Sequence, residues 1–256
     1  MDLEPLKTFR ASTNQASLLR HDGRLVLVKE YAGERPQERR DCEEQSLRAW
    51  KEAGFPVPEL FAVELPASPA RGPFLAMSHV QGVTLQEILQ DAGRPLVEKF
   101  ALLEEILRSG LRRHQLACEQ RQPRLIHPDP NTSNILCPDS GGFVFIDFET
   151  TGSGADLEES AAVELAKLCR WAARDLGVAH LPALMRQVVG IYRARPGLLR
   201  RLVARTHDRP LQFFHRWQDS RRRRRNPRDV TKYQLADALA AELARAGSPG
   251  RGPAPE

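Results

Sequence analysis

Three polar residues near the middle of the chain have types and spacing suited to phosphoryl transfer. Asp129 and Asn134 lie five residues apart, and Asp147 follows thirteen residues after Asn134, at the end of an apolar run. Phosphoryl transfer requires in-line positioning and neutralisation of the charge on the phosphate oxygens. Magnesium suits this task because it takes one or two carboxylates together with substrate phosphates. We therefore expect Asn134 and Asp147 to bind Mg²⁺, and Asp129 to orient an acceptor hydroxyl with mild general-base assistance.

The same segment resembles the catalytic loop and metal motif of the protein-kinase-like superfamily. The pattern H-x-D-x4-N begins at His127, and I-D-F surrounds Asp147. This superfamily includes choline and aminoglycoside kinases, Bud32-like atypical kinases, and the lipopolysaccharide core kinases that phosphorylate Kdo or heptose sugars. The resemblance spans residues 6 to about 190. It implies an α+β, two-lobed fold with a small antiparallel-sheet N-lobe that carries one helix, a mostly helical C-lobe, and ATP and Mg²⁺ as cofactors.

A β-branched run upstream of this segment matches the strand that carries the phosphate-binding lysine. Residues 25–31 form the run, with Lys29 near its end, and Asp22-Gly23 before it favours a tight hairpin turn. We predict three strands, at residues 6–11, 16–21 and 24–31. The resemblance implies that Lys29 bridges the α- and β-phosphates and pairs with a glutamate of the following helix.

The following segment, residues 39–54, is predicted to be that helix. Leu47 and Trp50 have helical spacing, and the segment ends at a glycine, which is a common C-terminal cap. Glu43, four residues before Leu47, is the expected partner of the lysine by analogy with the Bud32-like and sugar-kinase branches. Glu44 is the alternative.

Residues 74–85 resemble the strand and hinge that bind adenine through backbone groups. Met77 and Val80 would lie at the hinge, and Leu136 would complete the nucleotide contacts. Because backbone recognition leaves no side-chain signature, these contacts rest on the family resemblance alone. The resemblance implies an N-lobe over residues 1–80 and a C-lobe over 81–246. The composition of residues 247–256, rich in glycine and proline, predicts a disordered tail.

Several positions depart from the pattern of regulated protein kinases. The phosphate-covering turn, residues 11–16, contains no glycine, so Ser12 and Thr13 would substitute with hydroxyl groups. Glu149 replaces the glycine of the metal motif, which favours small-molecule kinases. Pro128 replaces the arginine that senses activation-loop phosphorylation, so we expect no such switch.

The rest of the chain shows mainly helical periodicity. Helices are predicted at residues 97–121, 157–176, 181–195 and 233–246, and short strands at 124–126, 135–137 and 143–146. His127 is expected to support the catalytic loop through hydrogen bonds and to take no part in the chemistry.

Length and composition fit one small two-lobed enzyme. The chain has 256 residues, 41% of them hydrophobic, and contains no apolar run of the length that a membrane span requires. Its acidic amino terminus lacks the basic and apolar regions of a signal peptide, so we expect a cytoplasmic protein. The four cysteines show no C-x-x-C spacing, which argues against a disulfide or zinc framework.

Positive charge is concentrated near the carboxyl end. Between Arg193 and Lys232 there are fourteen lysines and arginines against three aspartates. Such runs attract polyanions, although a solvated helix face is the simpler alternative. The densest run consists of Arg221, Arg222, Arg223, Arg224 and Arg225.

Together with the family resemblance, this charge favours one acceptor over others. We expect an ATP-dependent kinase that phosphorylates a lipopolysaccharide core sugar, with a lipid-linked phosphorylated oligosaccharide as anionic partner in preference to nucleic acid. Peripheral binding to the inner face of the cytoplasmic membrane, through the arginine run, belongs to this expectation. The alternatives are a Bud32-like atypical protein Ser/Thr kinase and a pseudokinase that acts as a binding module.

Overall fold

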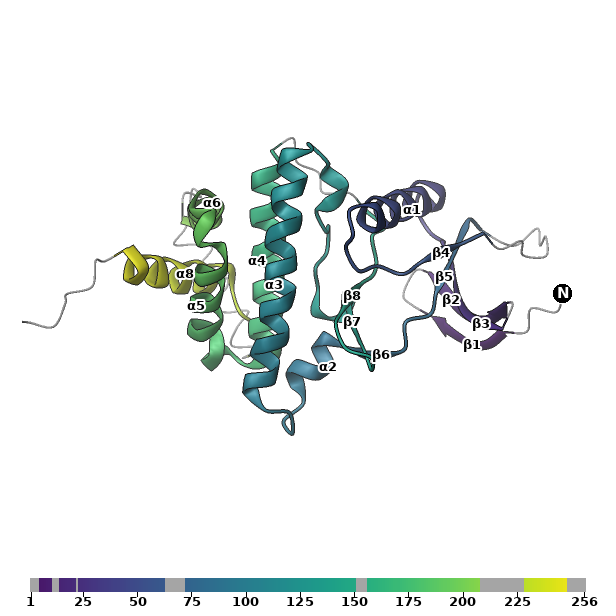
Figure 1. Cartoon of the computed structure of the whole chain (residues 1–256), viewed down its shortest axis with the longest axis horizontal. Helices are drawn as coiled ribbons and strands as arrows, with labels where there is room; N and C mark the ends of the chain where they lie inside the picture. The colour runs from purple at the N-terminus through teal and green to yellow at the C-terminus, as the bar shows by residue number, and fades with distance from the viewer. Residues whose placement is uncertain are drawn as a thin grey trace, which may run out of the picture.

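The chain is α+β, with a small antiparallel sheet and one helix in its N-terminal part and a mostly helical remainder (Figure 1). This arrangement, seen in a computed structural model, agrees with the α+β class predicted from the sequence. The structure describes residues 5–10, 14–21, 23–62, 72–150, 156–207 and 228–247. The predicted disordered tail therefore lies, except for residue 247, outside the described residues.

The N-terminal sheet has the strand order β1-β2-β3-β5-β4, with every neighbouring pair antiparallel. Its strands are β1 (Pro5–Arg10), β2 (Gln15–His21), β3 (Arg24–Glu30), β4 (Leu60–Phe61) and β5 (Phe74–Ser78). A two-residue turn joins β2 to β3, since His21 pairs with Arg24, and Gly23 in that turn has a φ of 77°. A positive φ is readily adopted by glycine, which explains the predicted hairpin.

Side-chain alternation along β3 places the predicted lysine on the inner face of the sheet. Val26 and Val28 are almost fully buried in a small cluster on one face. Leu27 and Lys29 therefore lie on the opposite face, because successive side chains of a strand point to opposite sides. Leu27 packs against the main hydrophobic core, so Lys29 faces the rest of the molecule.

Helix α1 (Pro36–Glu52) covers this inner face. Proline occupies its first turn, where a missing backbone N–H costs no helical hydrogen bond. The chain leaves the helix at Gly54, whose φ is 77°. The buried residues of α1 share one face at helical spacing: Glu43, Ser46, Leu47 and Trp50.

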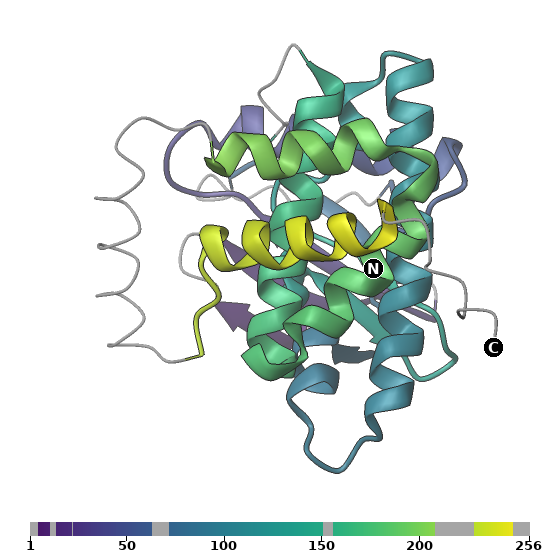
Figure 2. The same cartoon turned by 90° about the vertical axis from the view of Figure 1, so that its left-hand side faces the viewer.

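A second, three-stranded sheet, with the order β6-β7-β8, lies between the N-terminal part and the long helices of the remainder (Figure 1). These strands are β6 (Gly82–Thr84), β7 (Ile135–Pro138) and β8 (Val144–Phe145). The helices are α2 (Leu85–Gln90), α3 (Leu96–Glu119), α4 (Leu157–Leu176), α5 (Leu181–Ile191), α6 (Pro196–His207) and α8 (Lys232–Gly247). Helices α5, α6 and α8 form a layer beyond α3 and α4, with α8 packed across α5 and α6 (Figures 1 and 2).

Two local predictions were wrong, and both errors involve proline. The predicted strand at residues 124–126 overlaps a 3-10 turn (Pro123–Leu125), in which Ile126 N–H donates to the Pro123 carbonyl over 3.0 Å. The helix predicted at residues 181–195 ends at Ile191, and Pro196 begins α6, a helix that the sequence reasoning missed. A 3-10 turn (Tyr192–Ala194) follows α5, and Pro196 disfavours helical geometry in Arg195 before it, so α5 and α6 are separate helices.

Trp50, the largest fully buried side chain in the described part of the chain, packs between α1 and the helical part. It is fully buried, and its ring lies against Phe145 and Phe148 at centroid distances of 5.1 and 4.8 Å. The guanidinium of Arg113 stacks on the same ring at 4.2 Å, and the indole N–H donates to the Arg124 carbonyl over 2.8 Å. This one side chain therefore joins α1 to the segments that carry the catalytic-loop motif.

Replacing Trp50 with alanine should lower the free energy of unfolding by about 3–5 kcal/mol, because a large ring is removed from a filled core. Urea denaturation followed by circular dichroism measures this change. Val97→Ala is the control, since Val97 is 74% exposed and its loss should cost less than about 0.5 kcal/mol. A loss below about 1 kcal/mol for Trp50→Ala would contradict the packing described above.

Candidate active site

A cleft of about 640 Å³ lies between the inner face of the N-terminal sheet and the segments after η2 (Thr132–Asn134). Its walls come from β2, β3, α1 and β5 on one side and from β7 and the segment after β8 on the other. Seven of the eight residues predicted from the sequence line it: Lys29, Glu43, Met77, Val80, Asn134, Leu136 and Asp147. The eighth, Asp129, is exposed and lies outside the lining.

Lys29 lies at the centre of the cleft, among three carboxylates. Its Nζ is 2.7 Å from Glu43 Oε2, 2.9 Å from Asp147 Oδ1 and 2.7 Å from an oxygen of Glu149. Burial would lower the pKa of Lys29, but the three carboxylates outweigh this effect and raise it. Lys29 is therefore a fixed positive charge, suited to contact an anionic group.

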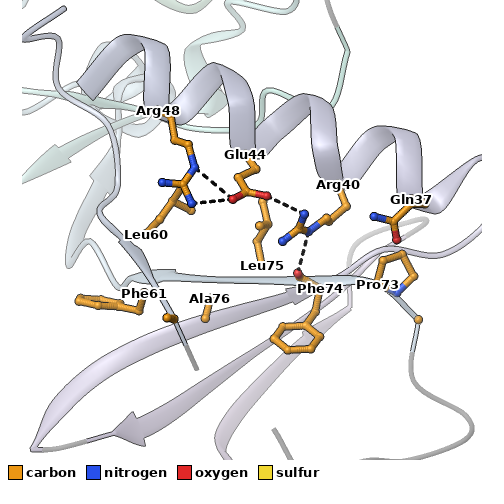
Figure 3. Close-up of a pocket in the computed structure, with 12 residues that line it drawn as sticks. Gln37, Arg40, Glu44, Arg48, Leu60, Phe61, Pro73, Phe74, Leu75 and Ala76 are labelled. Atoms are coloured by element: carbon orange, nitrogen blue, oxygen red, sulfur yellow. Dashed lines mark hydrogen bonds and ion pairs between the residues drawn. The ribbon is translucent and has the colours of Figure 1, made fainter. Parts of the chain in front are cut away.

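The structure distinguishes the two candidate glutamates of α1. Glu43 is buried and, besides the lysine, accepts a hydrogen bond of 2.5 Å from the Tyr31 hydroxyl. Glu44 lies on the other side of the helix, over a separate hollow, where it pairs with Arg40 at 2.6 Å and Arg48 at 2.7 Å (Figure 3). Glu43 alone of this pair is therefore part of the cleft.

His127 supports the segment 127–134 through two hydrogen bonds of its ring. The Asp129 backbone N–H donates to His127 Nδ1 over 3.1 Å, so that nitrogen is unprotonated and Nε2–H donates to the Ile146 carbonyl at 3.1 Å. Burial lowers the pKa of His127 to about 4. The ring is thus a neutral bridge between the loop and the residue before Asp147.

Asn134 connects the same two segments. Its side-chain amide nitrogen donates to the Asp129 backbone carbonyl over 3.0 Å, and its backbone carbonyl accepts from Ile146 N–H over 3.0 Å. Asp147 follows with a φ of 71°, a left-handed conformation that aspartate tolerates better than most residues. These constraints hold Asp129, Asn134 and Asp147 in one neighbourhood.

A buried ion pair holds the loop from the helical side. Glu164 on α4 accepts from the His127 backbone N–H over 2.8 Å and from Arg113 over 2.9 Å, and Arg113 also donates to the Leu125 carbonyl over 2.5 Å. Burial would raise the pKa of Glu164, but Arg113 and His114 beside it hold that pKa well below its usual range. The pair satisfies a backbone N–H and a backbone carbonyl that would otherwise be buried without partners.

Polar contacts also anchor the loop to α2 and α4. The Thr132 hydroxyl donates to the buried Asp175 over 2.5 Å, and Gln90 donates to the same carboxylate over 2.9 Å. Lys167 donates to the Pro128 carbonyl over 2.6 Å. The segment is therefore held along its length, and Asp129 is exposed on a rigid support.

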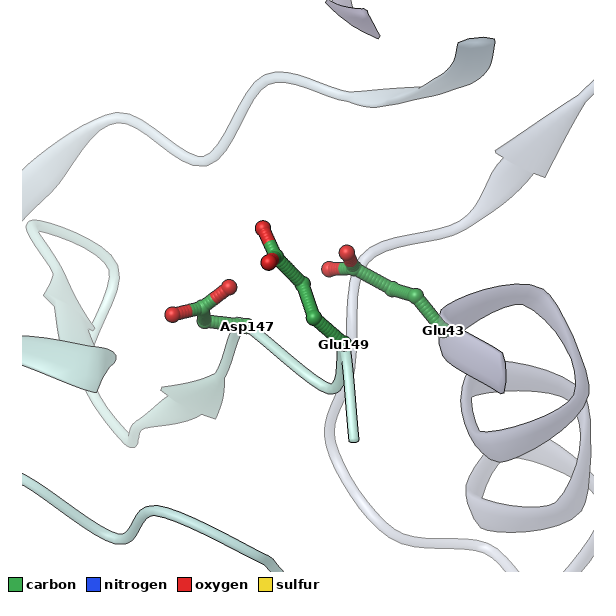
Figure 4. Close-up of side chains that lie close together, drawn as sticks. All are labelled: Glu43, Asp147 and Glu149. Atoms are coloured by element: carbon green, nitrogen blue, oxygen red, sulfur yellow. The ribbon is translucent and has the colours of Figure 1, made fainter. Parts of the chain in front are cut away.

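The oxygen donors in the cleft fit a hard divalent cation. One carboxylate oxygen from each of Glu43, Asp147 and Glu149 lies within 4.8 Å of the others (Figure 4). The Glu43 side chain is only 2% exposed, whereas those of Asp147 and Glu149 are 43% and 16% exposed, so Asp147 and Glu149 are the carboxylates that a metal ion can reach more easily. With the amide oxygen of Asn134 they form the donor set that Mg²⁺ prefers.

Glu149 was not among the residues that we predicted for the site. Its signal in the sequence was an acidic residue two positions after Asp147, where the resembled family has glycine. A carboxylate so close to a predicted metal ligand is itself a candidate oxygen ligand, and this is the signal that could have identified Glu149. Asn14 and Arg39 also line the cleft and were missed, since neither belongs to a motif.

Comparison with known proteins adds no identity: no protein-family model and no curated protein matches this chain. The geometry of the cleft and the spacing of the motif residues are therefore the grounds on which a function can be proposed.

The described arginines near the carboxyl end are largely paired within the molecule. Arg195, Arg201 and Arg205 pair with acidic residues at the start of α4: Glu158, Asp156 and Glu159, respectively. The run of five arginines, like Ser12 and Thr13, lies outside the described residues. None of the helices in the described part of the chain has the length and apolar character that crossing a bilayer requires.

Protonation of His127 should destabilise the fold at mildly acidic pH. Its pKa falls from 6.5 to about 4 on burial, so the unfolded chain binds more protons and stability declines as pH drops through this interval. Between pH 6.5 and pH 5, proton binding by this residue in the unfolded chain should lower the free energy of unfolding by up to about 2 kcal/mol. Urea denaturation at both pH values, on wild type and His127→Gln, measures the contribution, and equal losses in the two proteins would exclude it.

Proposed function

We propose that this chain is an ATP-dependent phosphotransferase with a two-lobed, protein-kinase-like fold. The single observation that carries the proposal is the 2.9 Å contact between Lys29 of the N-terminal sheet and Asp147 of the helical part, across a cleft of about 640 Å³. A fixed cation facing a cluster of oxygen ligands is what a metal–triphosphate complex requires, since its charge must be neutralised on both sides.

The cleft offers separate surfaces for the base and the phosphates of a nucleotide. Leu27, Met77, Leu136 and Ile146 supply apolar walls, next to the backbone of residues 77–80. We assign the adenine to this end, where backbone groups would bind its edge. Lys29, held by Glu43, would contact the phosphates at the other end.

The donor set described above would hold Mg²⁺ between the protein and the phosphates. Asn134 and Asp147 are its proposed ligands, with Glu149 as a further carboxylate. The metal, when bound, neutralises charge on the transferring phosphoryl group.

Asp129 is the proposed acceptor-orienting residue. It is exposed, and its backbone N–H and carbonyl are bonded to His127 and Asn134. A hydroxyl bound at its carboxylate would be oriented towards the γ-phosphate, and alignment of this kind contributes most of the catalysis in phosphoryl transfer.

For the acceptor we propose a sugar hydroxyl of the lipopolysaccharide core. Two features support it: the catalytic-loop resemblance, and the excess of arginine after residue 193. Three of the described arginines are paired with the start of α4. Residues 208–227, which lie outside the described residues, contain seven further arginines against two aspartates. The protein-kinase and pseudokinase alternatives are outcomes of the two experiments that follow.

Purified protein with ATP, Mg²⁺ and phosphorylated core oligosaccharide should release ADP, and Asp147→Ala should abolish the release. Glu43→Gln should lower kcat by roughly 10²- to 10³-fold, because the charge that positions Lys29 is lost. Glu44→Gln is the matched control: it neutralises the neighbouring glutamate, which faces away from the cleft, and should leave kcat unchanged. Turnover no higher than that of Asp147→Ala would reject the enzyme and favour the pseudokinase.

Deleting the gene in its host should remove one phosphate group from the core oligosaccharide, as measured by mass spectrometry. Complementation with wild type should restore it, and complementation with Asp129→Asn should not. An unchanged phosphate content in an otherwise active kinase would exclude the sugar acceptor and leave the protein-kinase alternative.

A further inference from the structure

Arg39 connects three separate segments at the edge of the cleft. It lies on α1 one turn before Glu43, and its side chain is 21% exposed. Its Nε donates to Glu149 Oε2 over 3.0 Å, and its Nη2 donates to the same oxygen. The remaining donors reach the Ala32 carbonyl at 2.7 Å and Asn14 Oδ1 at 3.2 Å. One guanidinium thus joins α1, the segment after β3, the start of β2 and the segment after Asp147.

The carboxylate of Glu149 is fully engaged in this arrangement. Its Oε2 accepts both hydrogen bonds from Arg39, and its Oε1 is bonded to Lys29 at 2.7 Å and to the amide nitrogen of Asn14. A carboxylate has about four acceptor positions, so all of them are in use. A metal ligated by Glu149 must therefore replace one of these partners.

A bound nucleotide would compete with Glu149 for Lys29 but not for Arg39. Lys29 is the residue proposed to contact phosphates, so nucleotide binding would draw its ammonium away from Glu149 Oε1. Arg39 has its other bonds to Ala32 and Asn14, which keep it in place. One acceptor position of Oε1 would then become free for a metal ion, while its bond from Asn14 and the two bonds from Arg39 to Oε2 stay in place.

We propose that Arg39 is a positioning residue, which holds Glu149 as a second carboxylate ligand for the metal that enters with the nucleotide. The inference rests on the proposed function and extends it: the metal site is completed only after the nucleotide takes Lys29. Binding of metal and nucleotide is therefore mutually reinforcing, because coupling between two ligands is reciprocal. An outer partner that orients a metal ligand typically contributes 10- to 100-fold to metal affinity.

Arginine is required for this role because of its shape. The planar guanidinium directs two N–H donors, on Nε and Nη2, at one carboxylate oxygen and still has donors for other groups. A lysine at the same position would keep the positive charge but would lose the planar arrangement of several N–H donors. Arg39→Lys therefore tests orientation separately from electrostatics.

The experiment is isothermal titration calorimetry of ADP, with Mg²⁺ and with EDTA in its place. The ratio of the two dissociation constants gives the metal-dependent gain in affinity, independently of turnover. Wild type, Arg39→Lys and Arg48→Lys are compared. Arg48→Lys is the matched control, since it makes the same substitution on the same helix at a residue that pairs with Glu44 outside the cleft.

In Arg39→Lys the dissociation constant in EDTA should stay within about twofold of wild type, and the metal-dependent gain should fall by roughly tenfold. Arg48→Lys should match wild type in both. Melting temperatures without ligand should be recorded for all three proteins. A lower melting temperature of Arg39→Lys with an undiminished metal-dependent gain would show that Arg39 is only structural, and would overturn the proposal.

Two other results would also overturn it. An equal loss in Arg48→Lys would trace the effect to the helix as a whole. ADP binding by wild type that does not respond to Mg²⁺ would leave Glu149 without a metal to bind. If wild type binds no ADP at all, the phosphotransferase proposal itself fails, which is a different result from a selective loss in Arg39→Lys.

Discussion

A largely buried ammonium group among three carboxylates is the interaction on which this structure depends. Lys29 comes from the N-terminal sheet, Glu43 from the helix that covers it, and Asp147 and Glu149 from the helical part. Removing a charge from water is costly unless it is paired, so the lysine and the carboxylates constrain one another's positions. The two parts of the molecule must therefore meet at this point, which is also where a cleft remains open.

The rigidity behind the cleft comes from buried polar groups. His127 stays neutral and bridges two backbone segments, while Glu164 and Arg113 satisfy backbone groups beneath the loop. Trp50 fills the space between α1 and these segments, so displacement of the helix would disturb the loop as well. Packing and hydrogen bonding thus position the same few residues from opposite sides, and Asp129 is left exposed.

Glu149 adds a carboxylate to the site that the motif alone does not predict. Where the resembled family has a glycine, this chain has a carboxylate held by Arg39, Asn14 and Lys29. That network ties the start of β2 to the segment after Asp147 through side chains. Near the carboxyl end, by contrast, several arginines are neutralised by the acidic start of α4, so a high local charge in the sequence is partly internal to the fold.

The sequence by itself determined most of the elements and identified Asp129, Asn134 and Asp147 as candidate site residues. Alternation along residues 24–30, helical spacing in residues 157–176 and the intervals among Asp129, Asn134 and Asp147 depend on local geometry, which short-range patterns record. Only the tertiary structure decided between Glu43 and Glu44, because adjacent helical residues point about 100° apart and docking selects the face. It alone brought Asn14, Arg39 and Glu149 together, since contacts between residues more than a hundred positions apart leave no periodic signal along the chain.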